Sequence, residues 1–191
     1  MLECKWINFF EEEEKVLAIE DKEEQKIRLE LLEEIMDKIN SYNQREEAYL
    51  YLQKRKEIIE RGVIFTEIEN VKGLRAKWSK IFAHEISPQV KKEIYYQSFK
   101  WHIFSYEKVN ALTRKKARAA FDKYEKSIAF IFYEHSDKAF LAENAHLLKS
   151  NDFDMDYDIY IFNPIEKWTY VHTHETVQCG PYFYQIKNQN E

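Results

Sequence analysis

Glycine and proline are scarce in this chain, with three residues of each among 191. That composition excludes collagen-like and low-complexity proteins. It also argues against a phosphate-binding loop, which needs several glycines so that bare backbone can approach the phosphate. Cysteine is equally rare: Cys4 and Cys179 lie near opposite ends of the chain and neither belongs to a CxxC pair. We therefore expect two reduced thiols rather than a disulfide scaffold.

Long apolar runs are also missing. The densest one, residues 128–133, is far shorter than the ~20 residues that span a bilayer. The acidic run Glu11–Glu14 interrupts the amino terminus before a signal-peptide core could form. We therefore expect a cytoplasmic protein without a membrane segment. The net charge of -5 leaves no broad basic face, which argues against nucleic acid as a partner.

What is present divides the chain in two. Residues 1–60 hold 10 Lys and Arg against 17 Asp and Glu, whereas all six histidines come later. Residues 8–39 lack Gly and Pro, and Ile27, Leu31 and Ile35 recur at four-residue steps, which predicts an amphipathic helix. With a break at 40–43 and a second helix to residue 61, residues 1–61 would form an acidic helical hairpin. We expect this arm to pack on the body, to form a homodimer through the N-terminal helices, or to recruit a basic partner.

The remaining residues, 62–191, alternate short strand patterns with helical ones. Strands are expected over residues 62–68, 101–106, 128–133, 158–162, 168–174 and 181–187, and helices over 71–85, 88–99, 113–125 and 136–148. Short links favour an antiparallel meander for the last three strands, while the earlier helical connections permit parallel pairs. We predict an α+β fold with one mixed, largely antiparallel sheet of five to six short strands flanked by helices. The apolar strand 128–133 should lie at its centre.

Several stretches of this body share motifs with a known family. They are Trp78 with Phe82, residues 101–107 (WHIFSYE), 131–133 (IFY), 158–161 (DIYI), 168–175 (WTYVHTHE) and 179–183 (CGPYF). On these motifs the chain resembles an uncharacterised bacterial family, domain of unknown function family 4275, over about residues 53–187. The resemblance implies no activity, substrate or catalytic residue, and the arm before residue 53 lies outside it.

The most specific candidate site is the pair His172 and His174. Alternation along a strand would send both imidazoles to the face that carries Trp168 and Tyr170. His102 as a third ligand, with Glu175 as general base, would give the zinc site of a metal-dependent hydrolase. The HxH spacing alone is not specific for metal, so we expect no cofactor. The same histidines can simply hydrogen-bond backbone carbonyls or tyrosine hydroxyls.

No other catalytic signature is present, so we expect a non-enzymatic protein-binding or regulatory module. Tyr and Trp concentrate in protein interfaces, and this chain is 16% aromatic. The candidate binding surface consists of Trp101, His102, Tyr106, Trp168, Tyr170, His172, His174, Glu175 and Tyr182. Two alternatives stay open. One is the hydrolase with His102, His172 and His174 as metal ligands, and the other is a small-molecule sensor with a pocket between the last strands and the preceding helices.

Overall fold

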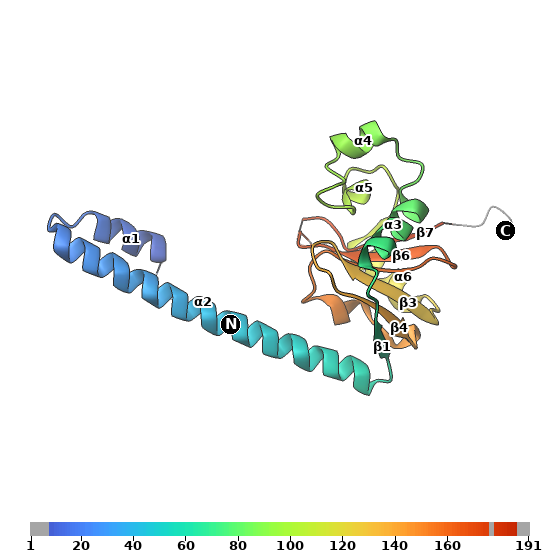
Figure 1. Cartoon of the computed structure of the whole chain (residues 1–191), viewed down its shortest axis with the longest axis horizontal. Helices are drawn as coiled ribbons and strands as arrows, with labels where there is room; N and C mark the ends of the chain where they lie inside the picture. Colours follow the sequence, from blue (N-terminus) through green and yellow to red (C-terminus); the bar gives the residue numbers. More distant parts are fainter. Residues whose placement is uncertain (1–7, 176–177, 187–191) are drawn as a thin grey trace. The chain divides into compact units, whose positions relative to one another are not determined.

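A computed structural model describes residues 8–175 and 178–186 of the chain. Cys4 and the expected strand end at Lys187 lie outside these ranges. The chain divides into two compact units, Met1–Arg55 and Lys56–Glu191. Figure 1 shows the elements of both. Within the described ranges, no helix combines the length and the apolar character that crossing a membrane requires.

The first unit is helical. Its elements are α1 (Phe9–Leu17) and α2 (Lys22–Glu60), a helix of 39 residues that runs on into the second unit. The Asp21 carboxylate accepts the Glu23 backbone N–H at the start of α2. The Gln25 side chain donates to the Leu17 carbonyl at 2.8 Å, so α1 folds back along the first turns of α2.

The predicted helical break at residues 40–43 is wrong, because α2 continues through it. Asn, Ser and Tyr each cost a helix only about half a kcal/mol relative to Ala, and this stretch has no Gly or Pro to interrupt the backbone. The chain instead reverses at residues 18–21, between α1 and α2. The N-terminal feature is therefore one long helix with a short helix beside its start, rather than two helices of similar length.

Within the described residues, the second unit is built on one seven-stranded sheet. Its strands are β1 (Ile64–Glu67), β2 (Leu112–Thr113), β3 (Ile128–Tyr133), β4 (Ala139–Glu143), β5 (Ile159–Asn163), β6 (Trp168–His172) and β7 (Tyr182–Gln185). Their order across the sheet is β1-β4-β3-β5-β6-β7-β2. The α+β class and the β5-β6-β7 meander are as predicted. The strand count and the mixed character are corrected, because over the residues that the structure describes the sheet has seven strands and every pair is antiparallel.

Helices cover both faces of this sheet (Figure 1). The helical elements are α3 (Val71–Phe82), α4 (Pro88–Glu93), α5 (His102–Ser105), α6 (Arg114–Lys123) and two 3-10 turns, η1 (Ala145–Leu147) and η2 (Ser150–Phe153). Alternation along the strands divides the core: Phe132 and Tyr160 pack with α3 and α5, whereas Ile131 and Tyr170 pack with α6. Strand β3 pairs with β4 and β5, which confirms its predicted central place.

Two predicted elements have the wrong type. The expected strand at residues 101–106 is instead the short helix α5, His102–Ser105, with its two flanking residues. Residues 136–148 form β4 and η1 instead of a helix, because residues 139–143 pair with β3 and with β1. Short apolar runs do not distinguish the two types by periodicity, so pairing partners that are distant in the sequence decide between them.

Candidate functional site

The two histidines of the HxH pair have different surroundings. Strand β6 ends at His172, whose ring is 3% exposed and whose Nδ1 donates to the Asp156 carbonyl at 2.7 Å. Burial lowers the pKa of His172, and the nearby Arg118 lowers it further, so this imidazole is neutral at neutral pH. His172 therefore acts as a buried hydrogen-bonding group on the α6 side of the sheet.

His174 lies beyond the strand and turns to other partners. Its Nδ1 is 2.9 Å from the Asp158 carboxylate, and its ring packs against Phe99 and Trp101, with centroids 5.0 and 5.8 Å away. Strand alternation does not apply after His172, so the prediction that both rings share a face is wrong. Sequence spacing could not reveal this, because the strand end is set by the pairing of His172 with Ile159.

His102 does not join the other two histidines in a metal site. Its Nδ1 donates to the Ile94 carbonyl at 2.6 Å, and α5 rather than a strand carries it. Its ring shares the neighbour Phe99 with His174, at a centroid distance of 5.4 Å. Over residues 8–175 and 178–186, no group of three or more His, Cys, Asp or Glu side chains could hold a metal ion. The geometry thus does not assemble the proposed three-histidine ligand set.

The aromatic residues chosen as a binding surface are mostly core. Trp101, Trp168, Tyr170 and Tyr182 are between 0% and 3% exposed, so their expected exposure is wrong. Tyr106 alone among the five aromatic members is exposed, at 47%. These large side chains fill the two layers between sheet and helices, where their apolar area contributes to folding instead of docking.

Buried polar groups hold the residues around α5 against the sheet. Asp158 accepts the Trp101 indole N–H at 2.9 Å and also orients His174. Nearby, Glu134 accepts the backbone N–H of Lys100 at 2.8 Å and pairs with the Lys100 ammonium group. The Tyr160 hydroxyl also donates to Glu134, and burial together with that carboxylate raises the pKa of Tyr160. This network satisfies its charges internally, which is typical of a structural role.

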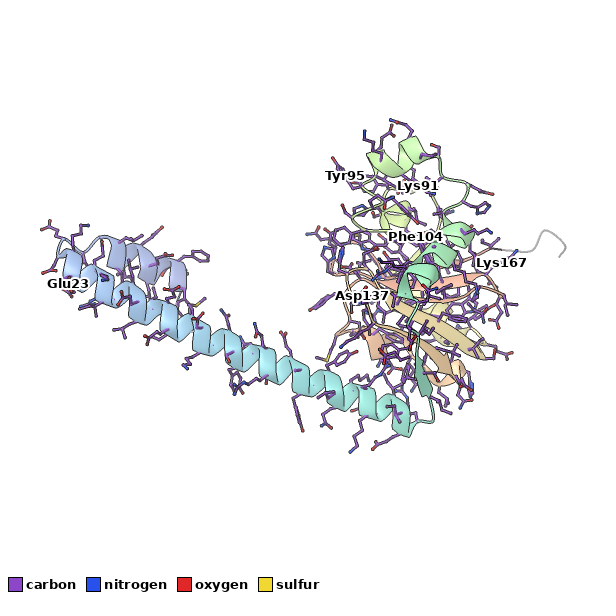
Figure 2. The ribbon with its side chains drawn as sticks, in the orientation of Figure 1. Glu23, Lys91, Tyr95, Phe104, Asp137 and Lys167 are labelled. Carbon is purple, nitrogen blue, oxygen red and sulfur yellow. The ribbon has the colours of Figure 1, made fainter. Side chains whose placement is uncertain are left out.

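A groove of about 630 Å³ opens beside this network. Its walls come from α5, from the segment that leads to β2, from the start of α6 and from the loop before β7. Figure 2 labels Phe104, which contributes to the apolar part and stacks on Tyr182 at 5.3 Å. The polar lining consists of Ser105, Glu107, Asn110, Thr113, Arg114 and Gln178. The groove therefore combines an aromatic wall with hydrogen-bonding groups and charges of both signs.

Cys179 lies in the wall of this groove. Its thiol donates to the Glu175 carboxylate at 3.3 Å, and the Tyr182 hydroxyl is its other side-chain partner. Burial and the Glu175 hydrogen bond raise the pKa of the thiol, so Cys179 is protonated at neutral pH. An activated nucleophile needs the opposite shift toward thiolate. Cys179 is thus a polar wall residue, and Glu175 and Tyr182 from the predicted set lie beside it.

Positive charge gathers where the groove continues along α6. A second hollow of about 600 Å³ shares Thr113, Arg114 and Gly180 with the first. It adds Lys115, Lys116 and Arg118 to the lining. Arg118 is paired with Asp154 at 2.6 Å, but in the described part of the chain Lys115 and Lys116 have no carboxylate partner. The groove can therefore offer cationic side chains to a ligand.

Arg114 is a groove residue that the predicted set of site residues did not include. The Arg114 guanidinium donates to the Gln178 carbonyl at 2.9 Å, which joins α6 to the loop before β7. The cluster of basic residues from Arg114 to Lys123 was visible in the sequence. The sequence did not show that Arg114 lies near Gly180, because this proximity results from the pairing of β2 with β7, which are nearly 70 residues apart in the chain.

Comparison with known proteins gives one positive result. Neither a curated protein nor a solved structure matches the chain. A family model does match, over residues 53–183, which include every strand from β1 to β6 and the groove just described. The match covers more than half of the 191 residues and excludes most of α2. The chain therefore belongs to DUF4275, a family described as a domain of unknown function.

Proposed function

We propose that this protein is a ligand-binding module that takes a small anionic molecule in the groove beside α6. The observation that carries the proposal is the groove itself, about 630 Å³ in volume, within the ~300–1,000 Å³ of typical small-molecule sites. It is lined by residues of α5, of the start of α6 and of the loop before β7, and this position supports the small-molecule hypothesis over the other two. An aromatic wall with a few convergent polar groups is typical of such sites.

The charges of the lining favour an anionic ligand. A guanidinium group has five N–H donors, and Arg114 donates one hydrogen bond to the Gln178 carbonyl. The other N–H groups of its side chain can bind a carboxylate or phosphate. Lys115 and Lys116 add positive charge at the same end. Glu107, which also lines the groove, disfavours a ligand that is anionic throughout. A small molecule with one acidic end fits this distribution.

The protein-binding module expected from the sequence rested on the absence of a catalytic signature, on the acidic arm and on exposed aromatic side chains. Because Trp101, Trp168, Tyr170 and Tyr182 are buried, they do not support it. The hydrolase alternative rested on three converging imidazoles, which have separate partners here. By contrast, the cationic side chains that line the groove, Arg114, Lys115 and Lys116, are exposed, which supports ligand binding there.

A titration with citrate and with inorganic phosphate, at constant ionic strength, tests the proposal. We expect saturable shifts of the Gly180 backbone amide and the Arg114 side-chain resonances in nuclear magnetic resonance spectra. The double variant Arg114→Ala/Lys116→Ala should weaken binding at least about tenfold, since each charge-assisted hydrogen bond contributes on the order of 1.5–3 kcal/mol.

The matched control is Lys123→Ala/Lys138→Ala, which removes the same charge at exposed positions outside the groove lining. This control should bind like the parent protein. An equal loss of anion affinity in both double variants would show that net charge alone explains the binding, which would contradict the proposal. An absence of saturable shifts with either anion would contradict it as well.

A further inference from the structure

An exposed apolar stripe follows α2. Its members are Ile27, Leu31, Ile35, Tyr42, Tyr49 and Leu52, each between 46% and 64% exposed. From Leu31 onward they occupy the first and fourth positions of a seven-residue repeat, the pattern by which helices pair in coiled coils. Lys38 and Arg45 occupy two fourth positions of this repeat, one on each side of Tyr42. We call the set Leu31, Ile35, Lys38, Tyr42, Arg45, Tyr49 and Leu52 the α2 seam.

Helix α1 covers a different face of α2. It packs over Leu29, Leu32 and Met36, which line a hollow together with Phe9. At about 100° per residue these positions lie on the side of the helix roughly opposite the seam. Figure 2 shows the side chains of α2 beyond α1 without another element of residues 8–55 over them. Among residues 8–55, Val16 is the only buried apolar residue, so this described part of the unit leaves most of its apolar surface in water.

We propose that the α2 seam binds a second copy of this chain, as an antiparallel pair of α2 helices. The two cations within the seam argue for this occupant and this orientation. In a parallel pair, Lys38 would face Lys38 and Arg45 would face Arg45 of the second copy, which places like charges together in the contact layer.

An antiparallel pair gives each cation a suitable neighbour. When the two helices cross between Asn43 and Gln44, first positions of the repeat face fourth positions of the second copy. Ile35 then faces Leu52, Tyr42 faces Arg45, and Tyr49 faces Lys38, and the two-fold symmetry repeats each contact. Arg and Lys over a tyrosine ring form favourable cation–π contacts. The alternation of tyrosines and cations along the seam is therefore self-complementary in this register.

The charges that flank the seam favour the same arrangement. Residues 31–43 hold one Lys against three Asp and Glu, a balance of -2. Residues 44–56 hold four Lys and Arg against two Glu, a balance of +2. An antiparallel copy places each half against the oppositely charged one, whereas a parallel copy would place like-charged halves together. A second copy of the chain thus matches both the apolar and the charged pattern.

Sedimentation equilibrium of the full chain tests whether the second copy binds. We expect a mass approaching twice 23.3 kDa as the concentration rises. Ile35→Asp places a carboxylate in two contact layers of the dimer and should weaken dimerisation at least about tenfold. Leu50→Asp is the matched control, because Leu50 is equally exposed, at 46%, but lies outside the seam. Circular dichroism checks that both variants keep their helix content.

Spin labels at residue 26 test the orientation. With Lys26→Cys in a Cys4→Ser/Cys179→Ser background, the 1.5 Å rise per residue puts antiparallel labels about 50 Å apart. A parallel pair would bring them within about 20 Å. A monomer at every concentration, equal effects of the two aspartate variants, or a short label distance would each overturn the proposal. A monomeric chain that another protein captures through the seam would overturn it as well.

Discussion

Two buried polar residues of this protein, His172 and Glu134, have structural roles. His172 is enclosed between β6 and the segment after η2, and its ring donates to the Asp156 carbonyl. Glu134 gathers Lys100 and Tyr160 in the same way on the opposite face. The partners are a backbone carbonyl for His172, and a backbone N–H, an ammonium group and a tyrosine hydroxyl for Glu134, so that desolvation is offset by hydrogen bonds.

The His172 pKa leads to a pH prediction. Burial lowers it below the ordinary 6.5. As pH falls through 6.5, the unfolded chain takes up a proton that the folded ring does not. Stability therefore falls with decreasing pH, by at most about 1.4 kcal/mol per pH unit for one group. His172→Gln can still donate a hydrogen bond but cannot titrate, so its free energy of unfolding should fall less between pH 7.5 and 5.5, a range set by this shift.

Urea unfolding at both pH values measures this difference. The control is His84→Gln at an exposed ring, 56% accessible, which should follow the parent protein. If His172→Gln and the parent lose the same stability over this range, the buried ring does not hold its neutral form as described.

At the scale of elements, α3 shows how a helix is fixed on the sheet. Asn70 caps it by accepting the Gly73 N–H at 2.9 Å, and one face of the helix carries Leu74, Trp78 and Phe82 into the core. The Trp78 ring packs edge-on against Tyr160 at 5.1 Å. Its indole N–H donates to Thr169 of β6 at 2.9 Å. Apolar packing and one directed hydrogen bond thus set the position of α3.

A double-mutant cycle at Trp78 and Thr169 measures how much the hydrogen bond between them contributes to stability. Thr169→Val leaves the buried indole N–H without its acceptor and should cost about 1–3 kcal/mol. Trp78→Phe loses the donor and some packing. The loss in the free energy of unfolding of the double variant should be smaller, by about 1 kcal/mol, than the sum of the losses in the two single variants. Urea unfolding gives the three values, and strict additivity would show that the hydrogen bond contributes nothing.

For the molecule as a whole, the two units differ in how much apolar surface they bury. Apart from Val16, every buried apolar residue of the described ranges comes from the second unit, between Ile58 and Phe183. A long helix without tertiary packing is only marginally stable in water. The second unit therefore holds nearly all of the folding free energy.

Hydrogen exchange of the dilute protein tests this division. Amides of β3 and β5, at the centre of the sheet, should exchange only when the whole unit unfolds. Amides of residues 22–50 should exchange at least about a hundredfold faster, since local opening exposes little apolar surface. Raising the concentration should slow exchange in α2 alone if the proposed pairing forms. Equal protection of both segments at low concentration would contradict the division.

The sequence by itself determined the elements whose signal is local. The helices that begin near residues 71, 88 and 113 and the apolar run of β3 depend on neighbours along the chain, and each was predicted with the right type. Only the tertiary structure decided the type of residues 101–106 and 139–143 and the separation of His172 from His174. The groove also belongs to this second group, because Arg114 and Cys179 meet only through the pairing of β2 with β7. Strand pairing brings together residues far apart in the chain, and no local pattern of side chains encodes which pairs will form.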